Sequence, residues 1–177
     1  MNENMINAEE YINNLKEMYR SYFDLKENTE IADKKFDLYA FSHIKNEKYF
    51  ATESLKIWEY AKYEHCLINK INTSESNLLP DKNFLKNAVD EVIELHRNHK
   101  QSYLTLIKIS ENGIDQDQVE NIQNFSYSKS FYFGFRGWLD LRLIVVDLKN
   151  NKVYTNEEGN KVKNNYKIQR FIKEKSS

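Results

Sequence analysis

Two histidines in the segment ELHRNH are the first residues whose spacing suggests chemistry. His96 and His99 lie three apart, so on a helix they would project from the same side and could present two imidazoles to one metal ion. The zincin pattern HExxH is absent, so further ligands, such as His43, His65, a carboxylate or water, would have to come from elsewhere. In the structural interpretation, which we favour, both imidazoles cap the C-terminal turn of the helix and suit its dipole. The pair keeps a metal-dependent hydrolase as the alternative function.

Opposite charges inside the most β-like segment of the chain form the second candidate. Asp140 and Arg142 lie two apart in an apolar strand and therefore share one face. If that face is accessible, Arg142 and Arg136 could bind an anionic or planar ligand while Tyr132 or Trp138 stacks against it. If the face is closed, the charges instead form an ion pair that fixes the strand register. These five residues are the predicted ligand-binding candidates.

A nuclease is a further, weaker alternative. Asp140 and the triplet Asp147-Leu148-Lys149 resemble the acid and the acidic-x-Lys triplet of restriction-endonuclease-like folds, which bind a divalent ion from neighbouring strands. Here six residues of one apparent strand separate the two acids. The pair Asn150-Asn151 indicates that the triplet forms the mouth of a hairpin.

The single cysteine, Cys66, bears on chemistry and on compartment. It follows His65, but adjacent strand residues point to opposite faces, so we expect a small core residue and no catalytic nucleophile. One cysteine excludes an internal disulfide and fits a reducing, cytoplasmic compartment. The N-terminus lacks the pattern of a signal peptide, and no segment approaches the roughly 18 apolar residues of a membrane span.

The elements that must position these residues follow from periodicity. Apolar residues at helical spacing predict an amphipathic helix over 7–23, and Pro80-Asp81 opens a second helix reaching about His99. A third, short helix runs from Asp115 to Phe125, with Gln118 completing its cap. A charged, helical tail closes the chain.

Strands are predicted between these helices. The segments 36–44 and 48–54 form a hairpin around Asn46, residues 55–63 are ambiguous between helix and strand, and 64–71 is strand-like before a loop at 72–77. A central strand covers 103–109 and ends at Asn112-Gly113. The aromatic run from Phe131 fills the sheet, turns at Arg136-Gly137 and continues as a strand over 139–146, and the turn at Asn150-Asn151 brings Leu148 opposite Val153.

This order of elements lacks regular βαβ alternation and predicts an α+β fold, with a mixed or largely antiparallel sheet packed by two or three helices. The 177 residues suit a single domain, 1–177, with frayed ends at 1–6 and 173–177. The 26 basic and 27 acidic residues give a net charge of −1, which favours neither nucleic acid nor an anionic membrane. The sequence identifies no cofactor. A protein or a small anionic or planar ligand is the partner we expect.

Two segments carry a resemblance. At KKFDLYA (34–40), and at FGFRGWLDLRLIVVDL with VYTN (133–148 and 153–156), the chain resembles a family of small uncharacterised prokaryotic proteins that share a domain of unknown function. The likeness spans most of the chain and implies a compact cytoplasmic domain, without an activity, substrate or cofactor. The leading hypothesis is therefore a non-catalytic binding or interaction protein that uses the aromatic and Arg-bearing sheet face.

Overall fold

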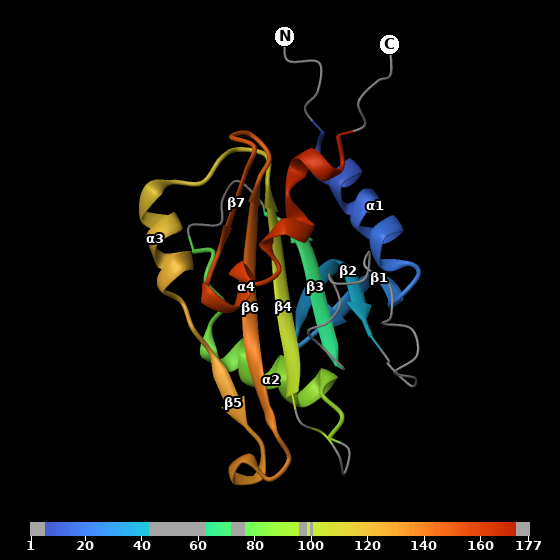
Figure 1. Cartoon of the computed structure of the whole chain (residues 1–177), viewed down its shortest axis with the longest axis vertical. Helices are drawn as coiled ribbons and strands as arrows, with labels where there is room; N and C mark the ends of the chain where they lie inside the picture. Colours follow the sequence, from blue (N-terminus) through green and yellow to red (C-terminus); the bar gives the residue numbers. More distant parts are fainter. Residues whose placement is uncertain (1–5, 43–62, 72–76, 96–98, 100, 173–177) are drawn as a thin grey trace.

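The chain is built on one mixed β-sheet with helices on both faces (Figure 1). The computed structural model describes residues 6–42, 63–71, 77–95, 99 and 101–172. The strands are β1 (Asp24–Ile31), β2 (Lys34–Phe41), β3 (Glu64–Lys70), β4 (Gln101–Ser110), β5 (Ser128–Ser130), β6 (Trp138–Asp147) and β7 (Lys152–Thr155). The α-helices are α1 (Ala8–Tyr19), α2 (Lys82–Val92), α3 (Gln116–Asn124) and α4 (Glu157–Asn160), and the 3-10 turns are η3 (Tyr132–Gly134), η4 (Lys163–Tyr166) and η5 (Ile168–Arg170).

The strand order is β1-β2-β3-β4-β6-β5, with β7 also paired to β6. β4 runs parallel to both of its neighbours, β3 and β6. The other pairs are antiparallel. This mixed sheet confirms the predicted α+β class. Within the described ranges, no helix has the length and apolar character needed to cross a membrane.

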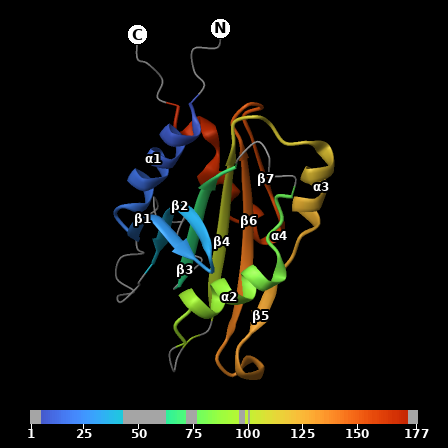
Figure 2. The ribbon, with the colours of Figure 1, turned by 180° about the vertical axis from the view of Figure 1, so that it is seen from behind.

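Alternation along the central strands separates two apolar cores. Ile107 and Ile144 face α1 and the C-terminal turns, whereas Leu106 and Leu143 face α2 and α3. Figure 1 shows α1 and the C-terminal turns on the first face. Figure 2, seen from behind, shows α2 lying across the second face.

The first hairpin corrects the sequence prediction. β2 does form, but it pairs with the preceding β1, with Leu25 opposite Ala40. Since β2 lies between β1 and β3, neither of its edges is left for the predicted partner at 48–54. β1 is an edge strand that buries only Ile31. Its sequence therefore lacks the alternation of apolar and polar residues from which a strand is predicted. The predicted partner itself, and residues 55–62 of the ambiguous segment, lie outside the described residues.

Helix α2 confirms its predicted start and corrects its end. Asp81 is the N-cap, and its Oδ1 accepts a hydrogen bond from Phe84 N at 2.8 Å. The helix ends at Val92, and Ile93 already has extended backbone angles (φ −91°, ψ 114°). The apolar stripe runs on past this point because the segment that follows is also partly buried, so periodicity alone could not place the end. His99 is therefore not in the helix.

The remaining elements follow their predicted segments closely. β4, α3 and β6 cover the expected regions, and Gln118 Oε1 accepts from Asp115 N at 3.3 Å, as the predicted cap requires. The last hairpin turns at the expected asparagines, but Val146, not Leu148, lies opposite Val153 because four residues form its turn. α1 is shorter than expected because β1 begins at Asp24.

The C-terminal segment forms short helical turns in place of a continuous helix, and it anchors in the sheet through Asn156. This buried amide accepts from Leu143 N and Gly159 N, each at 2.9 Å, and donates to Leu141 O at 2.9 Å. Tyr166 and Ile168 then enter the core next to α1. These few apolar residues determine how the tail packs, but they are not evident from its mostly charged composition.

Candidate functional site

The loop that joins β5 to β6 and the first residue of β6 expose a cluster of large aromatic side chains, and we call residues 131–138 the aromatic tip. The exposed fractions are 64% for Tyr132, 99% for Phe133, 89% for Phe135 and 47% for Trp138. Figure 1 shows this loop projecting beyond the sheet, at the end remote from α1. Apolar side chains exposed together in this way mark interaction sites in folded proteins.

The aromatic tip corrects the prediction that this run fills the sheet. β5 ends at Ser130, and the chain then leaves the sheet until β6 begins at Trp138. Gly134 (φ +89°) and Gly137 (φ +75°) adopt a backbone conformation that glycine takes without steric cost. The two glycines in an otherwise β-like run were the sequence signal for this loop, since aromatic content alone favours a strand.

The backbone of the aromatic tip is strained and well ordered by hydrogen bonds. Tyr132 (φ +49°) and Phe133 (φ +55°) are both left-handed, a conformation that costs a side chain with a Cβ about 1–2 kcal/mol. Phe131 N donates to Gly137 O at 2.9 Å, and Gly134 N donates to Phe131 O at 3.0 Å. The loop therefore holds its aromatic rings outward in a fixed, unfavourable conformation, a pattern found at functional sites.

His99 holds the aromatic tip to the sheet. Its Nδ1 lies 2.7 Å from Arg136 O and its Nε2 lies 2.6 Å from Ser102 Oγ. Because a carbonyl can only accept, Nδ1 is the donor to Arg136 O, and Nε2 shares a hydrogen bond with the serine hydroxyl. The ring of Phe131 packs edge-on against the imidazole, with centroids 5.7 Å apart. His99 thus acts as a buried clamp on the base of the loop.

The strain at Phe133 gives a direct test. Phe133→Gly should raise the free energy of unfolding by about 0.5–1 kcal/mol, because glycine relieves the left-handed conformation and the lost ring makes little contact with the fold. Phe135→Gly is the matched control, since Phe135 is similarly exposed but has an ordinary φ of −63°. Urea denaturation should show no gain for the control. Equal effects of the two substitutions would contradict stored strain.

Two of the predicted residues, Asp140 and Arg142, follow the aromatic tip on β6 and do not form an ion pair with each other. Asp140 is half-buried and accepts from Gln101 Nε2 at 3.0 Å and from Ser128 Oγ at 2.5 Å. Arg142 is fully buried and donates from Nη1 to Glu64 Oε1 at 3.1 Å. Arg142 is therefore paired with Glu64, and among its contacts with described residues Asp140 is not a partner.

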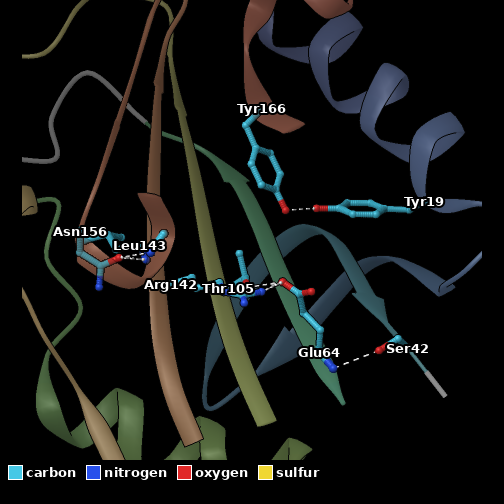
Figure 3. Close-up of polar contacts among 9 residues, drawn as sticks. Tyr19, Ser42, Glu64, Thr105, Arg142, Leu143, Asn156 and Tyr166 are labelled. Atoms are coloured by element: carbon cyan, nitrogen blue, oxygen red, sulfur yellow. Dashed lines mark hydrogen bonds and ion pairs between the residues drawn. The ribbon is translucent and has the colours of Figure 1, made fainter. Parts of the chain in front are cut away.

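Figure 3 shows how this buried pair connects the strands. Thr105 Oγ1 on β4 donates to the same Glu64 oxygen at 2.7 Å. Ser42 Oγ, just after β2, accepts from Glu64 N at 3.0 Å. The guanidinium carbon of Arg142 lies 3.5 Å from the ring centroid of Tyr103, whose phenol has its pKa raised by burial although the nearby guanidinium acts in the opposite direction. This network joins side chains of β3, β4 and β6 across the centre of the sheet.

The structure thus separates the five predicted binding residues into two groups. Tyr132, Arg136 and Trp138 lie in the aromatic tip, where the guanidinium carbon of Arg136 is 5.0 Å from the ring centroid of Tyr132. Asp140 and Arg142 belong to polar networks of the sheet. Phe133 and Phe135, whose exposed fractions are the highest among the large apolar side chains of the described residues, were not among the predicted site residues.

The histidine pair is only partly described. His96 and His43 lie outside the described residues, and His99 uses both ring nitrogens as the clamp on the aromatic tip. Across the ranges that the structure describes, no cluster of three or more histidine, cysteine or carboxylate residues could hold a metal ion. A metal site using His96 and His99 stays a prediction that no observation here favours.

Asp147 and Cys66, the other residues considered for chemistry, are both buried in the fold. Asp147 is buried and accepts from Asn150 N at 2.9 Å, from Asn150 Nδ2 at 2.8 Å and from Ile114 N at 3.2 Å, as expected for the mouth of a hairpin. Cys66 is fully buried in the core beside α1, and burial raises the pKa of its thiol. A thiol in this state has little nucleophilic character.

Comparison of the chain with known proteins identifies its family. Neither curated proteins nor solved structures gave a match. One family model does match, over residues 7–168, and its description is a domain of unknown function, DUF8052. This range includes every strand, the aromatic tip and the buried Glu64 and Arg142 pair. The chain therefore belongs to the DUF8052 family, whose domain has no assigned function.

Proposed function

We propose that this protein is a non-catalytic interaction module whose aromatic tip inserts into an apolar groove on another protein. The nearly complete exposure of Phe133 and Phe135 is the observation that carries the proposal. A folded domain rarely displays two phenylalanine rings of one short loop to water unless a partner covers them. The buried thiol of Cys66 supports a reducing, cytoplasmic setting for this interaction.

The composition of the aromatic tip fits the centre of a protein interface. Tyr, Trp, Phe and Arg are enriched there, and they supply most of the residues whose removal strongly weakens binding. The tip offers all four types within residues 132–138. Its internal hydrogen bonds and the His99 clamp also mean that little conformational freedom is lost on binding. The exposed guanidinium of Arg136 favours a carboxylate at the rim of the partner's groove.

A protein partner fits these observations better than a lipid surface. Arg136 is the one cationic residue within the aromatic tip, and the chain carries a net charge of −1. The neighbouring Lys129 already forms an ion pair with Asp90, with 2.6 Å between Nζ and Oδ1. Anchoring to an anionic membrane needs a cluster of basic residues or a larger apolar surface than this loop provides.

Site-specific photocrosslinking tests the proposal. We expect a benzoylphenylalanine side chain at position 133, in cells of the source organism, to crosslink one protein that is absent when the group is placed at position 22. Tyr22 is 42% exposed and lies outside the aromatic tip, so it controls for random contact. The partner is then identified and purified, and its affinity for the full chain is measured by calorimetry.

The affinity measurement decides between the possible outcomes. Phe133→Ser with Phe135→Ser should weaken binding by about 30-fold or more, as expected when interface anchors are lost, whereas Tyr22→Ser should leave it unchanged. Crosslinks only to a second copy of this chain would overturn the proposal. So would binding of the parent protein, but not of the double variant, to vesicles of phosphatidylserine and phosphatidylcholine.

A further inference from the structure

A cavity lies on the α2 face of the sheet, and none of the aromatic-tip residues 131–138 lines it. Its volume is about 360 Å³, and its walls come from β1, β2, β3, the start of β4 and the end of α2. Figure 2 shows these elements together, with α2 crossing the sheet beside β1 and β2. Sites for small molecules in proteins have volumes of roughly 300–1,000 Å³, so the cavity is large enough for a small ligand.

Three rings in nearly parallel planes line one side of the cavity. Tyr39 and Phe41 alternate along β2, and His65 lies opposite Phe41 on β3. The ring planes of Tyr39 and Phe41 differ by 23°, with centroids 5.0 Å apart, and those of Phe41 and His65 differ by 7°. A hydrogen bond of 2.7 Å between Tyr39 Oη and His65 Nδ1 fixes two of the rings. The faces of such rings attract cations.

The charged residues around the rings are mainly acidic. Among the residues that the structure describes, the cavity is lined by the carboxylates of Glu30, Glu91 and Glu94 and by one ammonium group, that of Lys26. Lys26 Nζ lies 5.3 Å from the centroid of Phe41, so this ring already interacts with a cation from the protein itself. Burial raises the pKa of the Tyr39 phenol, and the negative charges of Glu91 and Glu94 raise it further. The electrostatic field of these two carboxylates therefore acts on the rings.

We infer that this cavity binds a small organic ammonium ion, with its charge over the Tyr39 and Phe41 rings and balanced by Glu91 and Glu94. Three carboxylates against one ammonium leave an excess of negative charge that a cationic ligand would neutralise. Aromatic faces with a nearby carboxylate are the arrangement by which proteins recognise ammonium groups. Glu91 is fixed for this role, because its Oε2 accepts a hydrogen bond from Ala32 N at 2.7 Å.

Titrations followed by nuclear magnetic resonance test this inference with defined probes. Choline, spermidine and propylammonium are the cationic probes, and dimethylbutanol, the uncharged carbon isostere of choline, is the matched neutral one. We expect at least one cation to shift the amide resonances of Tyr39, Phe41 and His65 saturably. If choline binds, it should bind roughly tenfold or more tightly than its isostere.

Single substitutions test whether the cation binds in this cavity. Glu94→Gln, at an exposed side chain that the fold does not need, should weaken binding of the cation about fivefold or more, and Phe41→Leu should do the same. Glu9→Gln, on the exposed side of α1, is the matched control and should have no effect. The double serine variant of the aromatic tip should bind the cation normally, so this test is independent of the proposed protein interaction. Absence of saturable binding by all three cations, or equal binding by the Glu94 variant, would overturn the inference.

Discussion

Glu64→Ala is expected to lower the free energy of unfolding by about 3–5 kcal/mol, because it removes the carboxylate that neutralises the fully buried guanidinium of Arg142. The same substitution also removes the acceptor for Thr105 Oγ1. A charge taken out of water is costly to bury, and the loss of the facing opposite charge removes a contact that offsets this cost. Urea denaturation followed by circular dichroism measures the change.

Two further variants distinguish the buried pair from an ordinary ion pair. Replacing both partners, Glu64→Leu with Arg142→Met, should restore most of the lost stability, since apolar residues of similar size often substitute for a buried ion pair at little cost. Asp90→Ala breaks an ion pair with Lys129 whose two side chains are 56% and 29% exposed, and it should cost less than about 1 kcal/mol. Equal losses for Glu64→Ala and Asp90→Ala would contradict the role that we assign to the buried pair.

The second large effect is a steep loss of stability in alkali. Burial raises the pKa of the phenols of Tyr11, Tyr19, Tyr39 and Tyr166 above the ordinary value of about 10. Below about pH 9 these phenols are neutral in both the folded and the unfolded chain, so they leave stability unchanged. Above about pH 10 the unfolded chain releases protons that the folded chain keeps, so stability falls by about 1.4 kcal/mol per pH unit for each phenol.

The four phenols together should therefore cost about 5–6 kcal/mol per pH unit, and we expect the protein to unfold between roughly pH 10 and pH 12. The thiol of Cys66, whose pKa burial also raises, adds to this loss from about pH 9 upward. Circular dichroism across a pH series, with urea denaturation at each point, measures the slope.

A double variant checks the origin of the alkaline slope. Tyr19 Oη and Tyr166 Oη are hydrogen-bonded to each other at 2.7 Å, so Tyr19→Phe with Tyr166→Phe removes both partners at once and should change stability at pH 7 by no more than about 1–2 kcal/mol. The slope above pH 10 should fall by about 3 kcal/mol per pH unit, because two of the buried phenols are gone. An unchanged slope would show that other groups cause the alkaline unfolding.

Periodicity determined the elements whose burial pattern is strong. The alternating or continuous apolar residues of β2, β3, β4 and β6 predicted strands where strands are found, and the stripe of α2 predicted its start at Asp81. The mixed α+β class followed from the order of these elements. β1 was missed because it buries only Ile31, and the end of α2 was missed because its apolar stripe continues beyond Val92.

The sequence also singled out the residues Tyr132, Arg136 and Trp138, together with the unusual charges Asp140 and Arg142, as candidates for function. It could not separate those that face water from those in the interior, because aromatic side chains fill cores and interfaces equally well. The turn predicted at Arg136-Gly137 indicated a break in the strand, but not that the loop would turn its rings outward.

By itself, then, the sequence determined the strands and helices whose burial pattern is strong and the residues that are unusual for their place in a strand, since both depend on local pattern. Only the tertiary structure decided that Arg142 meets Glu64, 78 positions away, across β4, and that Phe133 and Phe135 lie in water. The pairing of strands far apart in the chain fixes these contacts and exposures. No local pattern specifies that pairing, because its free energy comes from surfaces that meet only when the whole sheet has formed.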